Sequence, residues 1–321
     1  MIKFITAYIK SMRLYYAFVT GIAGWVGVSF YQFLQPEQTT ALRSVAVLAL
    51  LFLSWGVNQI INDYLGLKED RINAPNRPMV TGELNAKAAL ALTFVLLAVM
   101  IIVTYFLNPW AIIAAIAGIL LNVLYEYSKA WGLAANIIFG VMISMCTAYG
   151  FLAAGPLPEP LFTTNRISVL ALVAIINGLM TYYTYFKDHH GDKLAGKETF
   201  IVRYGINVGR YVGVAGAFIS AISLLFFIAI DWLPFQTIIY KETFIFCCII
   251  TFFLQCRTAQ LFFSYPEGDR AYFSLVTNIR ACVAGQITLI AIFNQTLALY
   301  LMITSYILIG FFFDQYKDAK S

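Results

Sequence analysis

Long stretches of the chain carry no Asp, Glu, Lys or Arg, and this feature constrains the fold more than any other. About 20 consecutive apolar residues span the hydrocarbon core of a bilayer as one helix. The uncharged stretches are residues 14–36, 44–62, 88–125, 130–158, 167–186, 211–230 and 281–313, and residues 243–265 form a further span whose only charge is Arg257. A membrane β-barrel would instead show short alternating segments. The sequence therefore predicts an all-α, polytopic transmembrane helical bundle.

Two of these stretches leave the number of spans open between nine and ten. Residues 88–125 are long enough for two passes, and Asn108-Pro109 in their middle is typical of a turn. Residues 281–313 form either one long helix or two helices separated at Asn294-Gln295. The chain is 61% hydrophobic and 12% charged, which excludes a water-soluble fold. No linker or low-complexity segment divides it, so we expect a single membrane domain over residues 1–321.

Basic residues are distributed unevenly between the predicted loops. They gather at the N-terminus and in every second loop after it, whereas the opposite loops hold only Arg43, Arg166 and Lys241. Cytoplasmic loops carry the excess of Lys and Arg, so we expect the N-terminus and the charged loops to face the cytoplasm, in a prokaryotic cytoplasmic membrane. The net charge of +5 is explained by this topology, and it indicates no nucleic-acid partner.

Acidic and amide side chains concentrate in two of the charged loops, residues 58–82 and 187–199. Residues four apart share a helix face, so Asn62 and Asp70 belong to one stripe, and Asp188 and Asp192 form a second pair. Two carboxylates at this spacing repel unless a cation lies between them. Carboxylate and amide oxygens are the ligands that Mg²⁺ prefers.

The bases beside these acids are suited to phosphate; they are Arg71, Arg77, Lys129 and Lys193. Acidic stripes with basic flanks at the mouth of an apolar bundle predict a site for a diphosphate that carries a long apolar tail. The plainer alternative is that either loop, taken alone, holds only solvated charges that anchor its helix at the membrane surface.

At these residues the chain resembles the UbiA superfamily of intramembrane prenyltransferases. That family carries an NDxxDxxxD motif after its second helix and a DxxxD motif after its sixth. The stretch from Asn62 to Asp70 and the stretch from Asp188 to Asp192 match these motifs in kind and place. Asn76-Arg77-Pro78, Tyr125 with Lys129, and Asn136 match further family positions. Gly66 departs from the pattern, because the family has its middle aspartate there.

The resemblance implies a mechanism. Mg²⁺ held by Asn62, Asp70, Asp188 and Asp192 would neutralise the diphosphate as its bond to the allylic carbon breaks. The diphosphate itself would be bound by Arg71, Arg77, Lys129, Lys193 and Asn136. Tyr125 would stabilise the allylic cation through its ring. The cation would then be attacked by a small acceptor, commonly an electron-rich aromatic ring in this family.

Gly66 leaves the first stripe with Asn62 and Asp70 only, since Asp63 is offset by about 100° on a helix. This departure keeps a second function open within the family, a membrane terpene cyclase that ionises the same diphosphate and lets the chain attack itself. A rival from another class is a transporter whose intramembrane charges couple ions. It would place those charges near the midplane of the bilayer, whereas here they lie at helix ends.

Overall fold

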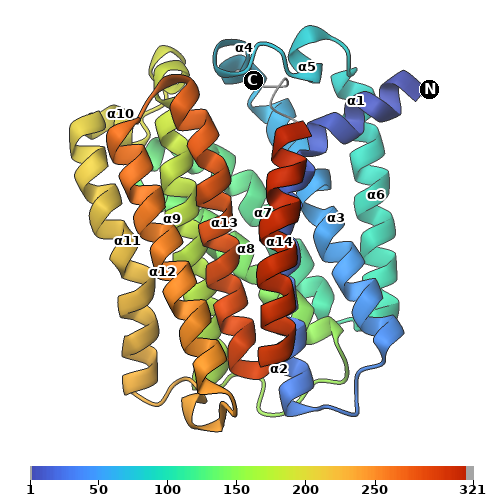
Figure 1. The fold of residues 1–321 in the computed structure, drawn as a ribbon. Helices are drawn as coiled ribbons and strands as arrows, with labels where there is room; N and C mark the ends of the chain where they lie inside the picture. Colours follow the sequence, from blue (N-terminus) through green and yellow to red (C-terminus); the bar gives the residue numbers. More distant parts are fainter. Residues whose placement is uncertain (1, 316–321) are drawn as a thin grey trace.

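The computed structural model describes residues 2–315, and every regular element in that range is helical. Ten segments within it are long and apolar enough to cross a membrane (Figure 1). They are η1 (Leu14–Tyr16) with α2 (Ala17–Leu34), α3 (Ala41–Leu65), α6 (Ala86–Leu107), α7 (Ala111–Ser128) with η2 (Lys129–Trp131), α8 (Leu133–Ala153), α9 (Thr164–Leu194), α11 (Ile206–Ala229), α12 (Lys241–Ser264), α13 (Gly268–Phe293) and α14 (Gln295–Gln315). The predicted helical membrane bundle is confirmed, and the upper of the two predicted span counts is the one observed.

Two asparagines terminate helices at the breaks that the sequence indicated. After α6, the Asn108 amide donates to the carbonyl oxygens of Leu152 and Gly155 at 2.8 and 2.9 Å, and its Oδ1 accepts from the Trp110 amide at 3.0 Å. After α13, the Asn294 Oδ1 accepts from the Leu297 amide at 3.0 Å. Side chains that satisfy free backbone groups at a helix end make such a break specific. The stretch 281–313 is therefore two helices.

The short helices gather at one end of the bundle, which we call the motif end. They are α1 (Ile2–Met12), α4 (Leu67–Asn73), α5 (Pro78–Thr81) and α10 (Phe200–Tyr204), and they lie at the top of Figure 1. At the other end of the bundle η3 (Phe235–Thr237) lies between α11 and α12. Successive membrane helices run in opposite directions, so the loops that carry the two acidic stretches both reach the motif end.

Close helix packing holds the centre of the bundle. Most of α2 and α13 is buried, whereas α6 and α11 turn most of their side chains outward. A Cβ at Gly27 on α2 would lie 2.0 Å from the carbonyl oxygen of Thr147 on α8, and one at Gly150 on α8 would lie 2.1 Å from that of Gly24. Only glycine permits backbones to approach this closely, which is the usual basis of tight helix contact in membranes.

The first membrane span is preceded by a sharp break at Arg13. This residue has φ 49° and ψ 65°. These angles lie in the left-handed region, which residues other than glycine seldom adopt. The break separates α1, whose Ile2, Ile5 and Ile9 are exposed, from η1 and α2. It also directs the Arg13 guanidinium into the bundle, where that group pairs with α3.

Candidate active site

A polar cavity of about 480 Å³ opens at the motif end, between side chains from most of the central helices. We call it the polar cavity. Its charged and amide lining residues are Arg13, Gln59, Asn62, Asp63, Glu69, Asp70, Asn73, Arg77, Glu126, Lys129, Lys187, Asp188, Asp192, Lys197 and Asp269. The topology brings residues as far apart in the chain as Arg13 and Leu275 to one cavity, because alternate helix ends meet at this end of the bundle.

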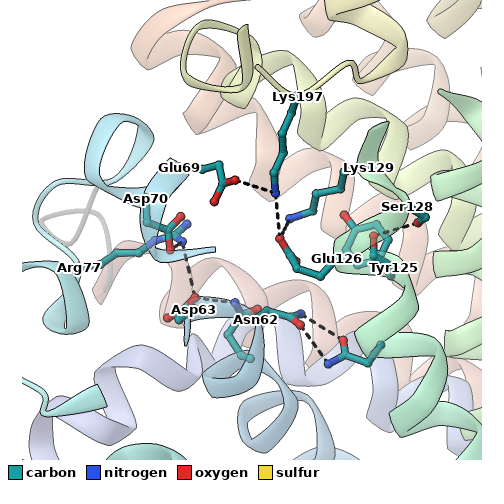
Figure 2. A network of polar contacts seen from close by, with 12 residues as sticks. Asn62, Asp63, Glu69, Asp70, Arg77, Tyr125, Glu126, Ser128, Lys129 and Lys197 are labelled. Atoms are coloured by element: carbon teal, nitrogen blue, oxygen red, sulfur yellow. Dashed lines mark hydrogen bonds and ion pairs between the residues drawn. The ribbon is translucent and has the colours of Figure 1, made fainter. Parts of the chain in front are cut away.

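The α3–α4 wall of the cavity is a network of aspartates and arginines. Asp63 Oδ1 lies 2.6 Å from Arg13 Nη2 and 3.5 Å from Arg77 Nη1, and it accepts a hydrogen bond of 2.8 Å from Gln59. Arg77 also forms an ion pair with Asp70. Figure 2 shows the Arg77 side chain reaching both aspartates. Both aspartates of this wall therefore have a guanidinium partner within the protein.

Burial affects the ionisation of this network. It raises the pKa of the Asp70 carboxyl, and the nearby Arg77 guanidinium opposes only part of that rise. Burial lowers the pKa of Arg77, but the carboxylates of Asp70 and Asp63 outweigh it and raise that pKa above its usual value. Arg77 therefore stays charged and is well placed to bind an anion that enters the cavity.

Asn62 is held by a partner on a neighbouring helix. Its amide donates to Asn122 Oδ1 at 3.1 Å, and the Asn122 amide donates back to Asn62 Oδ1 at 3.0 Å. The predicted stripe of Asn62 and Asp70 thus differs from the structure, because α3 ends at Leu65 and the chain resumes as α4 after Gly66. Asn62 lines the cavity, but its oxygen is already bound to α7.

The α9 wall presents Asp188 and Asp192 one helical turn apart. Asp188 forms an ion pair with its neighbour Lys187. Asp192 is buried and lines the cavity, and among residues 2–315 it accepts no side-chain hydrogen bond and forms no ion pair. This wall therefore offers a carboxylate that is not matched by a guanidinium, unlike the α3–α4 wall.

Between these walls stands a cluster at the end of α7 and the start of η2, which the sequence predicted only in part. Tyr125 and Lys129 line the cavity as expected, and the Lys129 ammonium lies 5.3 Å from the Tyr125 ring centroid. The cluster also contains Glu126, whose Oε1 lies 2.5 Å from Lys129 Nζ and 3.3 Å from Lys197 Nζ. Glu126 is the only acidic residue between Glu83 and Glu159, and a lone carboxylate in an apolar region was the available signal.

Three predicted phosphate-binding residues do not line the polar cavity. Arg71 and Lys193 are exposed, because each follows a cavity-facing aspartate on a helix and successive residues point about 100° apart. Asn136 is buried on α8 outside the cavity lining, and neither of its amide atoms has a hydrogen-bond partner among the described residues. The structure thus places these three side chains outside the cavity that the other predicted site residues line.

A smaller apolar cavity of about 100 Å³ adjoins the polar one. It lies between α3, α6, α7 and α8, and its lining includes Leu97, Ile101, Met142 and Ile143. Trp55, Gln59, Asn62 and Phe139 line both cavities and so form the partition between them. Thr104 and Tyr149 also line the apolar cavity, and their hydroxyl oxygens lie 2.8 Å apart. A charged head group and an apolar tail could thus be held side by side.

The donor atoms in the polar cavity suit a hard divalent cation. They are carboxylate and amide oxygens, and buried oxygens of Glu69 and Glu126 have no hydrogen-bond partner among the described residues. No group of three or more acidic, His or Cys side chains in the described part of the chain is arranged to hold a metal alone. Mg²⁺ usually takes only one or two protein carboxylates and completes its shell with water and substrate phosphates, so the residues fit such an ion.

Comparison with known proteins gives consistent matches. The model of the UbiA prenyltransferase family matches residues 17–279. Digeranylgeranylglyceryl phosphate synthase of Thermococcus sibiricus is 30% identical over 210 residues, which cover 64% of this chain and 71% of that protein.

Solved structures share the fold. One described for digeranylgeranylglyceryl phosphate synthase has a TM-score of 0.61 at 19% identity and covers 91% of this chain and 99% of that one. A UbiA homologue from Archaeoglobus fulgidus, bound to DMAPP and Mg²⁺, has a TM-score of 0.58 at 14% identity and covers 88% and 98%.

Proposed function

The chain belongs to the UbiA prenyltransferase family, and from this premise we propose that it catalyses the Mg²⁺-dependent transfer of a prenyl group from an isoprenyl diphosphate to a small acceptor within the membrane. The observation that carries the proposal is the junction of the two cavities at Trp55, Gln59, Asn62 and Phe139. An isoprenyl diphosphate has the same division into a charged head and an apolar tail.

The basic side chains of the polar cavity bind the diphosphate in this proposal. Arg77, Lys129 and Lys197 line the cavity, and charge-assisted hydrogen bonds from such groups are the strong contacts to phosphate oxygens. Arg71 and Lys193, which are exposed, have no direct part. Asp70, Asp188 and Asp192 are the residues we propose to hold Mg²⁺, which when bound neutralises charge on the leaving diphosphate.

Aromatic side chains face the place where the allylic carbon would lie. Tyr125, Trp55 and Phe139 all line the polar cavity, and the Tyr125 and Phe139 ring centroids are 5.0 Å apart. When the carbon–oxygen bond breaks, its electron pair leaves with the diphosphate and the allylic fragment becomes a cation. Ring faces stabilise that cation and exclude water until the acceptor attacks and gives up its proton.

The family resemblance implies an aromatic acceptor, and a second candidate comes from the relatives. Several matched proteins are named for digeranylgeranylglyceryl phosphate, a glyceryl phosphate that bears prenyl groups. A phosphate-bearing acceptor would suit a cavity that contains Arg13 and Lys187 besides the residues assigned to the diphosphate. One assay with both acceptor classes separates them.

The test is the release of diphosphate by the purified protein in detergent. Allylic diphosphates of several chain lengths are supplied with and without Mg²⁺, and with either a phenolic acceptor or a prenylated glyceryl phosphate. We expect release that needs both Mg²⁺ and one acceptor class, with a prenylated adduct in the mass spectrum. Release without acceptor, giving a cyclic hydrocarbon or alcohol, would establish the cyclase instead. No release with any donor would refute the proposal.

We further propose that the motif end faces the cytoplasm, because the loops at the opposite end hold only Arg43, Arg166 and Lys241 as basic residues. Single cysteines at exposed Glu159 and Glu198 report on the two ends. In intact prokaryotic cells that express the protein, a membrane-impermeant maleimide should label Glu159→Cys and spare Glu198→Cys. The reverse pattern would invert the topology.

A further inference from the structure

Gly66 lies at the kink between α3 and α4, at the edge of the polar cavity. Its backbone angles are φ −92° and ψ 12°, which other residues also adopt, so the turn itself does not require glycine. A Cβ at this position would lie 3.0 Å from the backbone oxygen of Asn62, a tight contact that any side chain here would make. It would lie 3.6 Å from Glu126 Oε1 and 3.9 Å from Glu69 Oε2. A side chain at residue 66 would therefore extend toward two carboxylates that come from α7 and α4.

The two glutamates share one lysine and keep one oxygen each unpaired. Lys197 Nζ lies 3.1 Å from Glu69 Oε1 and 3.3 Å from Glu126 Oε1, and Lys129 adds a second contact to Glu126 (Figure 2). The Glu126 side chain is only 5% exposed. Oε2 of Glu69 and Oε2 of Glu126 are buried and have no hydrogen-bond partner among the described residues.

Unpartnered buried carboxylate oxygens are unfavourable, because a buried charge needs compensation at each of its lone pairs. Lys129 and Lys197 supply the compensating charge in the structure, but their ion pairs are with the Oε1 atoms of the two glutamates. A divalent cation with a preference for oxygen would satisfy the remaining atoms. The two lysines, which line the same cavity, would then be available to phosphate oxygens.

We propose that Glu126, together with Glu69, forms a cation-binding carboxylate pair of the polar cavity, distinct from the pair on α9. Glu126 delivers from α7 the carboxylate that a side chain at residue 66 would otherwise deliver from the α3–α4 kink. This inference rests on the proposed function, in which the cavity takes a divalent cation with a diphosphate. It assigns to Glu126 a role that the acidic stretches of the sequence did not indicate.

The experiment counts Mn²⁺ ions bound to the purified protein by electron paramagnetic resonance, in which free Mn²⁺ gives the signal. Mn²⁺ prefers the same oxygen ligands and octahedral geometry as Mg²⁺. We expect Glu126→Gln to remove one bound Mn²⁺ per chain or to weaken its binding at least tenfold. Glu198→Gln, whose side chain is 65% exposed and pairs with Arg203 outside the cavity, is the matched control and should bind as the native chain does.

Rescue from residue 66 makes the test specific. In the Glu126→Gln background, Gly66→Asp should restore the lost Mn²⁺, because it places a carboxylate in the same space from the other side. Gly66→Ala in that background adds the same Cβ without the charge and should restore nothing. Native binding by Glu126→Gln, or equal binding by the Asp and Ala double variants, would overturn the inference.

Two further readouts keep the outcome decisive. If Glu126→Gln does not fold, Gly66→Asp and Gly66→Ala are compared in the native background, where the proposal expects tighter Mn²⁺ binding by the Asp variant and is refuted by equal binding. If the native chain turns over its substrate and Glu126→Gln binds Mn²⁺ as the native chain does, this inference alone is refuted. If the native chain shows no turnover but Glu126→Gln still binds less Mn²⁺ than the native chain, only the proposed function is refuted.

Discussion

The α3–α4 wall and the α9 wall of the polar cavity hold their carboxylates in different ways. On the first wall Asp63 and Asp70 pair with the guanidinium groups of Arg13 and Arg77. On the second, Asp188 has the adjacent Lys187, and Asp192 has no ion-pair partner among residues 2–315. Removal of one partner from a buried ion pair is strongly destabilising, because it leaves the other charge uncompensated. A carboxylate without such a partner is available to a ligand. The walls therefore share a motif type but differ in how far their charges are compensated within the protein.

The largest effect should come from the unmatched wall. Asp192→Asn removes a negative charge that would hold the proposed cation, and that cation would neutralise the diphosphate. We therefore expect the rate of diphosphate release to fall about a thousandfold. The melting temperature should change little, because no protein partner loses its ion pair. A variant that keeps more than half of the native rate would contradict the comparison.

The matched wall should respond in stability. Asp63→Asn leaves Arg13 and Arg77 beside a neutral amide, and removal of one partner from a mostly buried ion network costs about 3 kcal/mol. The measurement is the free energy of unfolding in mixed micelles, followed by tryptophan fluorescence. Glu198→Gln breaks an ion pair in which both side chains are more than 40% exposed, and it should cost less than about 0.5 kcal/mol. Equal losses in the two variants would erase the distinction between the walls.

The arginines test the same comparison from the ligand side. Arg77→Ala should raise the KM for the isoprenyl diphosphate roughly tenfold to a hundredfold, the value of a hydrogen bond to a charged group. Arg71→Ala and Lys193→Ala should change KM less than about twofold, since exposed charges contribute little. If Arg71→Ala matched Arg77→Ala, the exposed loop charges would have to fold over the cavity when substrate binds.

The smallest expected effect concerns Asn62 and Asn122. Either residue changed to Ala leaves the amide of the other, Asn62 half-buried or Asn122 buried, without its partner. We expect a loss of about 1 kcal/mol in unfolding free energy. The double variant should lose less than the sum of the single variants, which is the mark of a direct contact. Additive losses together with weaker Mn²⁺ binding in Asn62→Ala would instead return Asn62 to the cation site.

Sequence periodicity and hydropathy were sufficient to predict most of the fold. Uncharged stretches located the spans, and Asn108 and Asn294 marked the breaks. The start of α13 was missed, because Asp269 and Arg270 stand in its first turn and a search for uncharged residues begins only after Arg280. The separate helix α1 was also missed, because no glycine or proline marks the left-handed break at Arg13 in the sequence.

Spacing along one helix was enough to predict which side chains lie close together. Asp188 and Asp192 lie one turn apart on α9, so both face the cavity. Spacing did not predict the neighbours of Asn62 and Asp70, because α3 ends before Gly66 and α4 begins after it. In the structure Asn62 contacts Asn122, and Asp70 pairs with Arg77. Arg71 and Lys193 show the complementary error, because closeness in sequence to an active-site acid does not fix the direction of a side chain.

The sequence alone determined that this chain is a helical membrane protein with charged chemistry at one end, because helix length and the cost of charge in lipid are local properties. It also determined the family, through motifs whose residues are neighbours in the chain. The tertiary structure decided which charges meet. Glu126 approaches Gly66 across 60 residues of sequence, and Arg13 meets Asp63 across 50. Such contacts depend on how helices pack side by side, and no periodicity within a single helix encodes that arrangement.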